Sequence, residues 1–152
     1  PRQKTLVWID PATGEELPPR RSPRTGRLSD ALPSLIFIKN QLFHEHLTLR
    51  VQLLDVIEYR LRDGWGNDGR RGAHRLDRVP TAVGDAAALS APADLAALLP
   101  PLPETFTAAE LGRSLKLTGR NLSAAINILY TFHAVERIGR QKNAYLYAPA
   151  KP

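Results

Sequence analysis

The residues of this 152-residue chain that could do chemistry are first of all two carboxylates in one strand-like segment, Asp55 and Glu58. Metal-dependent nucleases use two or three converging carboxylates to hold magnesium. A restriction-type core has an acidic residue on one strand and Glu-x-Lys on the next, whereas the triplet here is Glu58-Tyr59-Arg60. Arginine cannot accept a proton, and the spacing directs Asp55 and Glu58 to opposite faces of a strand. We therefore predict that both carboxylates are solvated or paired with arginines beside a bulge, and that this chain carries no catalytic residue.

A second cluster, His44-Glu45-His46, resembles a metal-binding set in composition only. Adjacent and next-but-one positions of a helix point in different directions, so these side chains converge poorly. The sequence contains no cysteine, which excludes disulfides, thiol nucleophiles and cysteine-based metal sites. The triplet is better explained as the end of a helix, where histidine suits the negative end of the dipole. We therefore predict neither a metal nor a cofactor.

Basic side chains are the most abundant charged groups of the chain. Lysine and arginine number 21 against 15 acidic residues, a net charge of +6, and arginine supplies 16 of the 21. Guanidinium groups fork onto phosphate oxygens, so this composition favours a polyanionic partner. Residues 104–152 hold +4 of the surplus and residues 60–78 hold +3, whereas residues 31–59 and 79–103 together are negative. No apolar run reaches the length of a membrane span, so we expect a soluble, cytoplasmic protein without a membrane partner.

Two loops concentrate these arginines. Residues 18–27 contain three prolines and four arginines, which predicts an extended basic loop with Arg21 and Arg24 exposed. Residues 63–78 contain four glycines, Trp65 and a further group of arginines, Arg70, Arg71 and Arg75. We predict that both loops anchor phosphates. Trp65 can stack on a base or pack over the neighbouring strand, and the sequence leaves both open.

The elements that must position these residues can be read along the chain. We predict a strand over 4–10, a tight turn at 10–14, a helix over 30–43 and a strand over 47–61. The Pro- and Ala-rich segment 81–90 is predicted to be a linker, followed by a short helix over 91–99. The expected domains are therefore 1–80 and 91–152. No methionine is present and the chain begins at Pro1, which leaves open a trimmed initiator and a piece of a longer protein.

The segment after residue 104 has the clearest pattern. Thr107 and Glu110 have the spacing of a capping box that opens a helix, and Thr118 is placed to cap a second helix after a short turn. This second helix has an apolar face, and its opposite face is polar and comprises Arg120, Ala124, Asn127 and Thr131, with Asn121 and Ser123 at its edges. Strands are predicted over 134–139 and 144–148, joined by a basic turn at 140–143.

Two helices, a short turn and a hairpin with a basic tip resemble the winged helix-turn-helix family over residues 90–148. The resemblance implies three helices plus a β-hairpin wing that contact double-stranded DNA. It places Arg120, Asn121, Ser123 and Asn127 near base edges. It places Lys116 and Thr118 at phosphates, and Arg140, Lys142 and Asn143 in the wing contact. The chemistry agrees, because arginine can bond guanine, asparagine can bond adenine, and a helix N-terminus favours phosphate.

The whole chain also resembles, more faintly, the C-terminal part of uncharacterised bacterial proteins that carry a nuclease-like segment upstream. In these an Arg/Gly/Trp-rich loop leads into a winged helix ending in a Gly-x-x-x-Asn-Ala-x-x-Tyr hairpin, here Gly139 to Tyr147. The expected fold is therefore α+β, with a small mixed sheet-and-helix N-terminal region followed by a C-terminal winged helix. The expected function is binding of double-stranded DNA in transcription regulation, replication or repair. A targeting fragment of a nuclease-like enzyme and a protein-interaction or homodimerisation module remain as alternatives.

Overall fold

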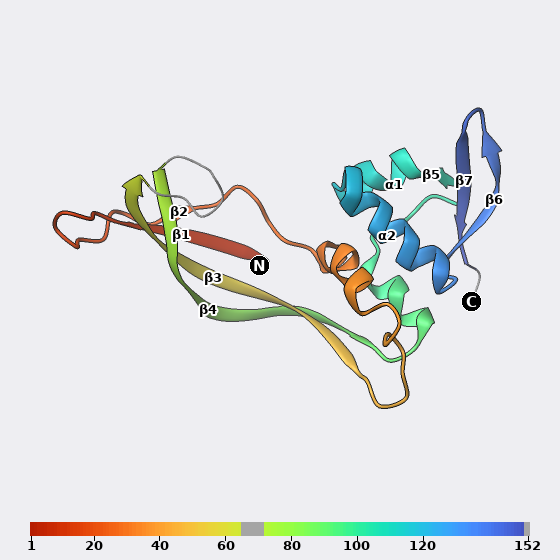
Figure 1. Ribbon diagram of the computed structural model, residues 1–152, viewed down its shortest axis with the longest axis horizontal. Coiled ribbons are helices and arrows are strands. Elements are labelled where there is room, and N and C mark those ends of the chain that lie inside the picture. The colour runs from red at the N-terminus through yellow and green to blue at the C-terminus, as the bar shows by residue number, and fades with distance from the viewer. Residues whose placement is uncertain (65–71, 151–152) are drawn as a thin grey trace. The chain divides into compact units, whose positions relative to one another are not determined.

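The computed structural model describes residues 1–64 and 72–150, which form two compact units (Figure 1). Unit 1 comprises Pro1–Arg27 and Gln52–Asp85, and unit 2 comprises Leu28–Val51 and Ala86–Pro152. Each unit is therefore assembled from two separate stretches of chain. Two long strands, β3 (Leu49–Gly64) and β4 (Gly72–Leu89), have most of their length in unit 1 and their ends in unit 2.

Unit 1 is a four-stranded sheet with the strand order β2-β1-β3-β4. Strand β1 (Gln3–Ile9) runs parallel to β3, and the short β2 (Arg20–Arg21) runs antiparallel to β1. The predicted strand over 4–10 and the turn after it are confirmed. The Asp10 carboxylate accepts the backbone N–H groups of Ala12 and Thr13, and Gly14 has a φ of 73°, which glycine adopts without strain.

The hairpin formed by β3 and β4 differs most from the sequence-based expectation. The predicted strand over 47–61 is confirmed as β3, but much of the expected loop over 63–78 and nearly all of the expected linker over 81–90 belong to β4. The alanines of this segment favour a helix locally, but pairing with β3 outweighs this weak preference. Pro80 is compatible with the strand because β4 lies at the edge of the sheet, where a missing N–H costs little.

Unit 2 contains the helices of the described chain and a three-stranded sheet with the order β5-β7-β6. Its elements are the 3-10 helices η1 (Leu28–Ile38) and η2 (Pro92–Leu98), strand β5 (Phe106–Thr107), helices α1 (Ala108–Leu115) and α2 (Gly119–Thr131), and strands β6 (Val135–Gln141) and β7 (Ala144–Pro149).

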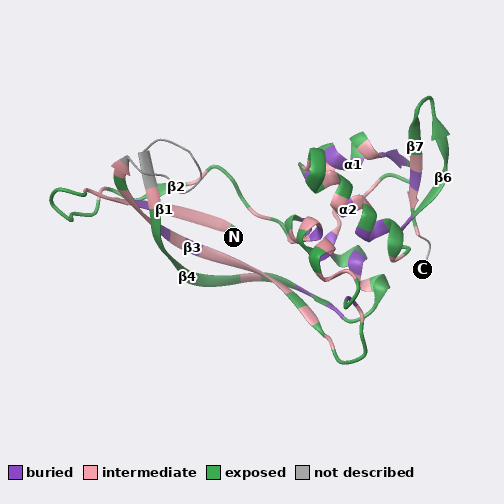
Figure 2. Cartoon of the chain, viewed as in Figure 1, coloured by how far each residue is buried: buried purple, intermediate pink, exposed green. Residues whose placement is uncertain are grey.

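The hydrophobic core of the protein lies in unit 2, where the buried positions gather (Figure 2). Helix α2 buries Ala125, Ile128 and Leu129 and packs against η1. Helix α1 crosses α2 closely, because a Cβ at Gly112 would come within 2.8 Å of a Leu122 methyl carbon. The predicted capping box at the start of α1 is confirmed, since Thr107 Oγ1 accepts the Glu110 N–H and Glu110 Oε2 accepts the Thr107 N–H.

The predicted fold class, with a C-terminal winged helix of three helices and a hairpin over 91–152, is wrong. The protein is sheet-rich, with 40% strand and 28% helix, and the expected first helix of the three is the short 3-10 helix η2. The apolar face of α2 is instead covered by η1, whose Leu32 and Leu35 are buried in the same core. Unit 2 is thus not a self-contained C-terminal domain, because it takes in Leu28–Val51.

The predicted helix over 30–43 is also corrected, since it is the 3-10 helix η1, with Pro33 inside it. None of the helices in the described ranges is both long enough and apolar enough to cross a lipid bilayer.

Candidate nucleic-acid interface

The start of helix α2 presents polar and basic side chains to solvent. Thr118, Arg120 and Asn121 are all exposed, and the first turn of α2 contains no acidic residue. Thr118 occupies the N-cap position as predicted, but its side chain makes no capping hydrogen bond. No side chain of α2 therefore competes with an anion for the N–H groups of this turn. Lys116, at the end of α1, is exposed and has a φ of 54°.

Two residues of the polar face of α2 already have partners within the protein. The Ser123 hydroxyl donates to the Gly119 carbonyl oxygen at 3.3 Å, and Asn127 Oδ1 accepts a hydrogen bond from Lys39 Nζ at 2.8 Å. Asn127 is therefore less suited to reading a base than the sequence-based expectation assumed. In exchange, Lys39 brings a cation next to this face, a contribution that only the packing of α2 on η1 reveals.

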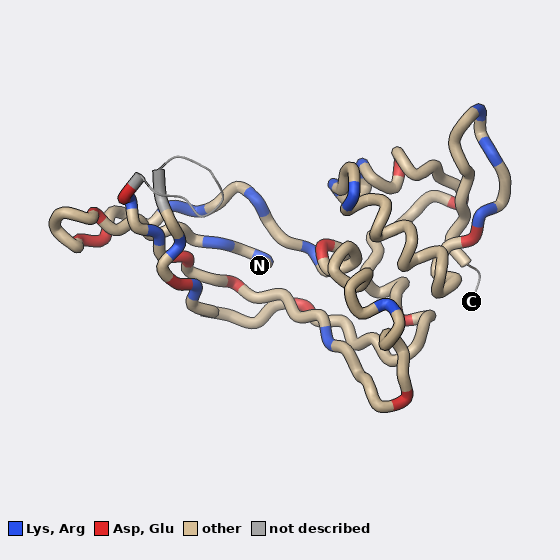
Figure 3. The backbone as a smooth tube through the Cα atoms, in the orientation of Figure 1, with Lys and Arg blue, Asp and Glu red and all other residues tan. Residues whose placement is uncertain are grey.

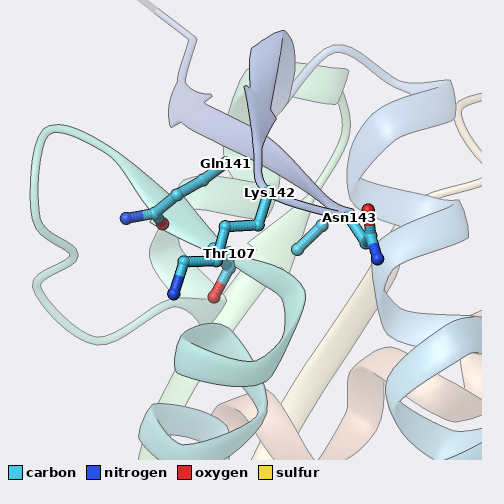
Figure 4. A pocket seen from close by; sticks show the side chains of 5 residues that line it. Thr107, Gln141, Lys142 and Asn143 are labelled. Atoms are coloured by element: carbon cyan, nitrogen blue, oxygen red, sulfur yellow. The ribbon is translucent and has the colours of Figure 1, made fainter.

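The turn between β6 and β7 is basic and open. Gln141 pairs with Ala144, so Lys142 and Asn143 form the turn itself, and Lys142 has a φ of 54°. A solvent-open hollow of about 630 Å³ lies here, lined by Thr107, Gln141, Lys142, Asn143 and Ala144 (Figure 4). The turn thus brings Lys142 and Asn143 to the surface, as the sequence predicted.

A cluster of arginine and tyrosine joins α2 to this hairpin, and sequence reasoning missed it. The Arg137 guanidinium carbon lies 5.0 Å from the ring centroid of Tyr130 on α2 and 3.6 Å from that of Tyr145 on β7. Arg140 lies 4.7 Å from the Tyr145 centroid and donates a hydrogen bond to its hydroxyl at 2.9 Å. These hydrogen-bond and charge interactions lower the pKa of Tyr145.

A β-bulge explains why the cluster could not be predicted. Arg137 pairs with Tyr147, but Gly139 pairs with Leu146, so Ile138 is an extra residue in β6. Regular alternation would place Arg137 and Arg140 on opposite faces of the hairpin. The bulge shifts the phase and brings both arginines to the face that carries Tyr145. The only signal in the sequence is Gly139, a residue type frequent at such irregularities.

The remaining predicted phosphate contacts belong to unit 1. Arg21 on β2, Arg24 in the loop after it and Arg75 on β4 are all exposed. Arg70, Arg71 and Trp65 lie outside the described residues. Basic positions are therefore distributed over both units, as the tube in Figure 3 shows.

The carboxylates Asp55 and Glu58 lie on opposite faces of β3, since the pairing with β1 is continuous over residues 55–61. That pairing with β1 contains no bulge, contrary to one prediction, but the predicted pairing with arginines is confirmed. Asp55 bonds Arg2, and Glu58 bonds both Arg60 and Arg78.

Burial of Glu58 disfavours its charged form, but hydrogen bonds from Arg78 and Arg60 and the charge of Lys4 outweigh it. They lower the pKa of Glu58 from 4.5 to about 2. A carboxylate engaged in this way is fully ionised at neutral pH and is a poor general base.

The His44-Glu45-His46 triplet is exposed, and His46 Nε2 lies 3.4 Å from Glu45 Oε1. Within residues 1–64 and 72–150, no group of three His, Asp or Glu side chains is arranged to hold a metal ion.

The fold and these surfaces define a two-unit, sheet-rich protein with basic surfaces on both units. Residues 1–90 match the family model described as a domain of unknown function (DUF8091), and the chain belongs to this family. The match covers unit 1 and the first part of unit 2, whereas α1, α2 and the β6–β7 hairpin follow it. No curated protein and no solved structure matches the chain.

Proposed function

We propose that unit 2 binds double-stranded DNA through the start of α2 and the β6–β7 hairpin. The observation that carries this proposal is the Arg137–Tyr130–Tyr145 cluster. It ties the last turn of α2, a helix whose first turn is exposed and free of acidic residues, to a hairpin that carries Arg140 and Lys142.

In this mode Arg120 and Asn121 reach base edges in the major groove, where arginine recognises guanine and asparagine recognises adenine. The first-turn N–H groups of α2, Lys116 and Lys142 contact phosphates. Tyrosine rings hold Arg137 and Arg140 in place, so these arginines lose little side-chain entropy when they contact the phosphates of the DNA backbone. The exposed arginines Arg21, Arg24 and Arg75 of unit 1 add phosphate contacts without sequence preference.

The test is a salt titration of binding to a fluorescently labelled duplex, comparing the protein with the Arg120→Ala/Arg140→Ala variant. Each lost phosphate contact flattens the dependence of log affinity on log salt by about 0.9. We therefore expect weaker binding, by about tenfold or more at moderate salt, and a shallower slope.

The matched control is Arg50→Ala/Arg113→Ala, which removes the same charge from exposed positions of unit 2 outside α2 and the hairpin. If the two double variants lost the same affinity for the duplex, binding would depend on net charge alone and not on the start of α2 and the hairpin. Unchanged affinity of the Arg120→Ala/Arg140→Ala variant would reject the proposal.

A protein partner is the second candidate for this surface. Tyr130 and Tyr145 are 44% and 37% exposed around Arg137, and interfaces between proteins are enriched in tyrosine and arginine. A second copy of this chain is the simplest such partner. Light scattering of the free protein that gives a dimer mass, lost in Tyr130→Ala/Tyr145→Ala, would favour this candidate over DNA.

A further inference from the structure

The most unusual side-chain arrangement outside unit 2 is a buried carboxylate surrounded by cations on the sheet of unit 1. Glu58 is fully buried. Its Oε1 lies 2.6 Å from Arg60 Nη2 and 3.5 Å from Lys4 Nζ, and its Oε2 lies 2.6 Å from Arg78 Nη2. We call Lys4, Glu58, Arg60 and Arg78 the Glu58 cluster. Three cations and one carboxylate give it a net charge of +2.

The cations of the cluster exceed what the carboxylate needs. One cation neutralises Glu58, and each guanidinium, with five N–H donors, directs only its Nε and Nη2 groups at it. The side chains of Lys4, Arg60 and Arg78 remain 23%, 33% and 40% exposed. Like charges held this close repel one another, and an anion at the surface relieves that repulsion. A phosphate oxygen suits the planar guanidinium donors.

An aromatic ring shares the face of the sheet on which the cluster lies. In the pairing of β1 with β3, Leu6 is opposite Glu58 and Trp8 is opposite Arg60, and paired residues project to the same side. The Arg60 guanidinium carbon lies 5.9 Å from the Trp8 ring centroid. Arg20 of β2 pairs with Leu6 and adds an exposed cation to this face.

No second layer of unit 1 covers this face within the described residues. The helices belong to unit 2, and Val7 and Val56 are the apolar side chains that unit 1 buries. Many proteins bind single-stranded nucleic acid on a sheet face that combines cations with an aromatic ring. The phosphates contact the cations and the bases stack on the ring.

We propose that this face of unit 1 binds single-stranded nucleic acid, with a phosphate held by Arg60 and Arg78 and a base stacked on Trp8. The carboxylate of Glu58 acts as a positioning residue, because it holds both guanidinium groups in one place before the strand arrives. This site uses none of the residues that the duplex contact of unit 2 requires, so the two proposals stand independently.

The experiment titrates the full chain with a labelled oligothymidylate and follows anisotropy together with tryptophan emission. A Trp65→Phe background leaves Trp8 as the single tryptophan. We expect the oligothymidylate to quench Trp8 emission. We also expect it to bind about tenfold more weakly to the Arg78→Lys variant, which keeps the positive charge but loses the paired N–H donors of the guanidinium group. The matched control is Arg50→Lys, at an exposed position of β3 outside both the Glu58 cluster and the residues proposed for the duplex contact, and it should bind as the parent does.

A second variant separates an organised site from general electrostatic attraction. Glu58→Gln makes the protein more positive by one charge, so attraction by net charge alone predicts tighter binding. The organised site predicts weaker binding, because Arg60 and Arg78 lose the group that aligns them. Backbone amide exchange of β1 and β3 shows whether Glu58→Gln keeps its sheet. If Glu58→Gln loses the sheet, the binding measured for Arg78→Lys decides the test.

The outcomes decide between clear alternatives. Equal affinity of Arg78→Lys and its parent, or Trp8 emission that the strand leaves unchanged, would overturn the site. Quenching by inorganic phosphate at the same concentration of phosphate groups would reduce it to a simple anion site and would also contradict the proposal. The Arg120→Ala/Arg140→Ala variant should bind oligothymidylate normally, and a loss there would assign the strand to unit 2 instead.

Discussion

Different forces stabilise the folds of the two units of this protein. Within the described part of the chain, unit 2 buries a core of fifteen apolar residues, nearly all from its helices and strands. Unit 1 is a sheet in which the described residues that are buried are Val7, Val56 and the ionised Glu58, and three partly exposed cations surround Glu58. Apolar burial stabilises unit 2 over a wide range of pH and salt, whereas unit 1 depends on charges that must stay ionised.

This difference bears on how each unit can bind a partner. Divided by unit, the charges balance to +3 in each, since unit 1 has 12 basic and 9 acidic residues and unit 2 has 9 and 6. The same net charge is nevertheless displayed differently. In unit 2 the cations lie over a rigid apolar core and reach outward from α2 and the hairpin. In unit 1 the cations of the Glu58 cluster are part of what holds the sheet together, so a bound anion and the stability of unit 1 are linked.

The largest effect is expected from opening the core of unit 2. Leu129→Ala removes a fully buried side chain and should lower the free energy of unfolding by about 2–5 kcal/mol. Urea unfolding followed by far-UV circular dichroism measures it. The control Phe37→Ala, at a position 86% exposed, should change stability by less than about 0.5 kcal/mol. If Leu129→Ala shifted the unfolding transition followed by Trp8 emission as much as the transition followed by circular dichroism, the two units would unfold cooperatively. That result would contradict their separate stabilisation.

An intermediate effect is expected from acid on unit 1. The pKa of Glu58 is about 2 in the folded protein against an ordinary value of 4.5, so its stabilisation is complete above pH 4.5 and is lost as the pH falls towards 2. The pKa difference corresponds to roughly 3 kcal/mol. Trp8 emission in the Trp65→Phe background should report acid unfolding of unit 1 before unit 2 loses its helical signal. Glu58→Gln should remove this part of the pH dependence, and coincident transitions in both units would contradict the assignment.

The smallest effect sharpens the account of unit 2. Thr107→Ala removes a capping hydroxyl that accepts the Glu110 N–H and should cost about 1 kcal/mol. Thr118→Ala, at a capping position whose side chain makes no such bond, should cost much less. Thermal unfolding of the two variants side by side measures the contrast. Equal losses would mean that the Thr118 hydroxyl caps α2 in solution.

Local features of the fold could be predicted well. The Asp10 turn depends on contacts between residues two and three positions apart, and the capping box of α1 on residues three apart. The strands β1, β3, β6 and β7 were all predicted, and β3 was recognisable from its alternating apolar residues. The predicted linker and the winged-helix arrangement failed for one reason. Both were inferred from segments considered alone, whereas β4 is set by its pairing with β3, and α2 is covered by η1 from far along the chain.

The candidate sites divide in the same way. The exposed start of α2 and the basic turn at Lys142 and Asn143 followed from the sequence, because capping and turn preferences are local. The phase of Arg137 relative to Arg140 depends on a bulge in the pairing of β6 with β7. The Glu58 cluster depends on three strands meeting. Strand alternation places Arg60 on the face of Glu58, but no residue spacing along the chain predicts that Lys4 and Arg78 reach it.

By itself the sequence determined the arginine-rich surplus of charge, the absence of cysteine chemistry, the helix pair near the C-terminus and the projection of Asp55 and Glu58 from opposite faces of one strand. Only the tertiary structure decided that Lys4 and Arg78 join Arg60 around Glu58, that Lys39 engages Asn127, and that Leu28–Val51 completes unit 2. The physical reason is range. Propensity and capping act within a few residues, whereas register and packing are set by the free energy of contacts between segments distant in the chain.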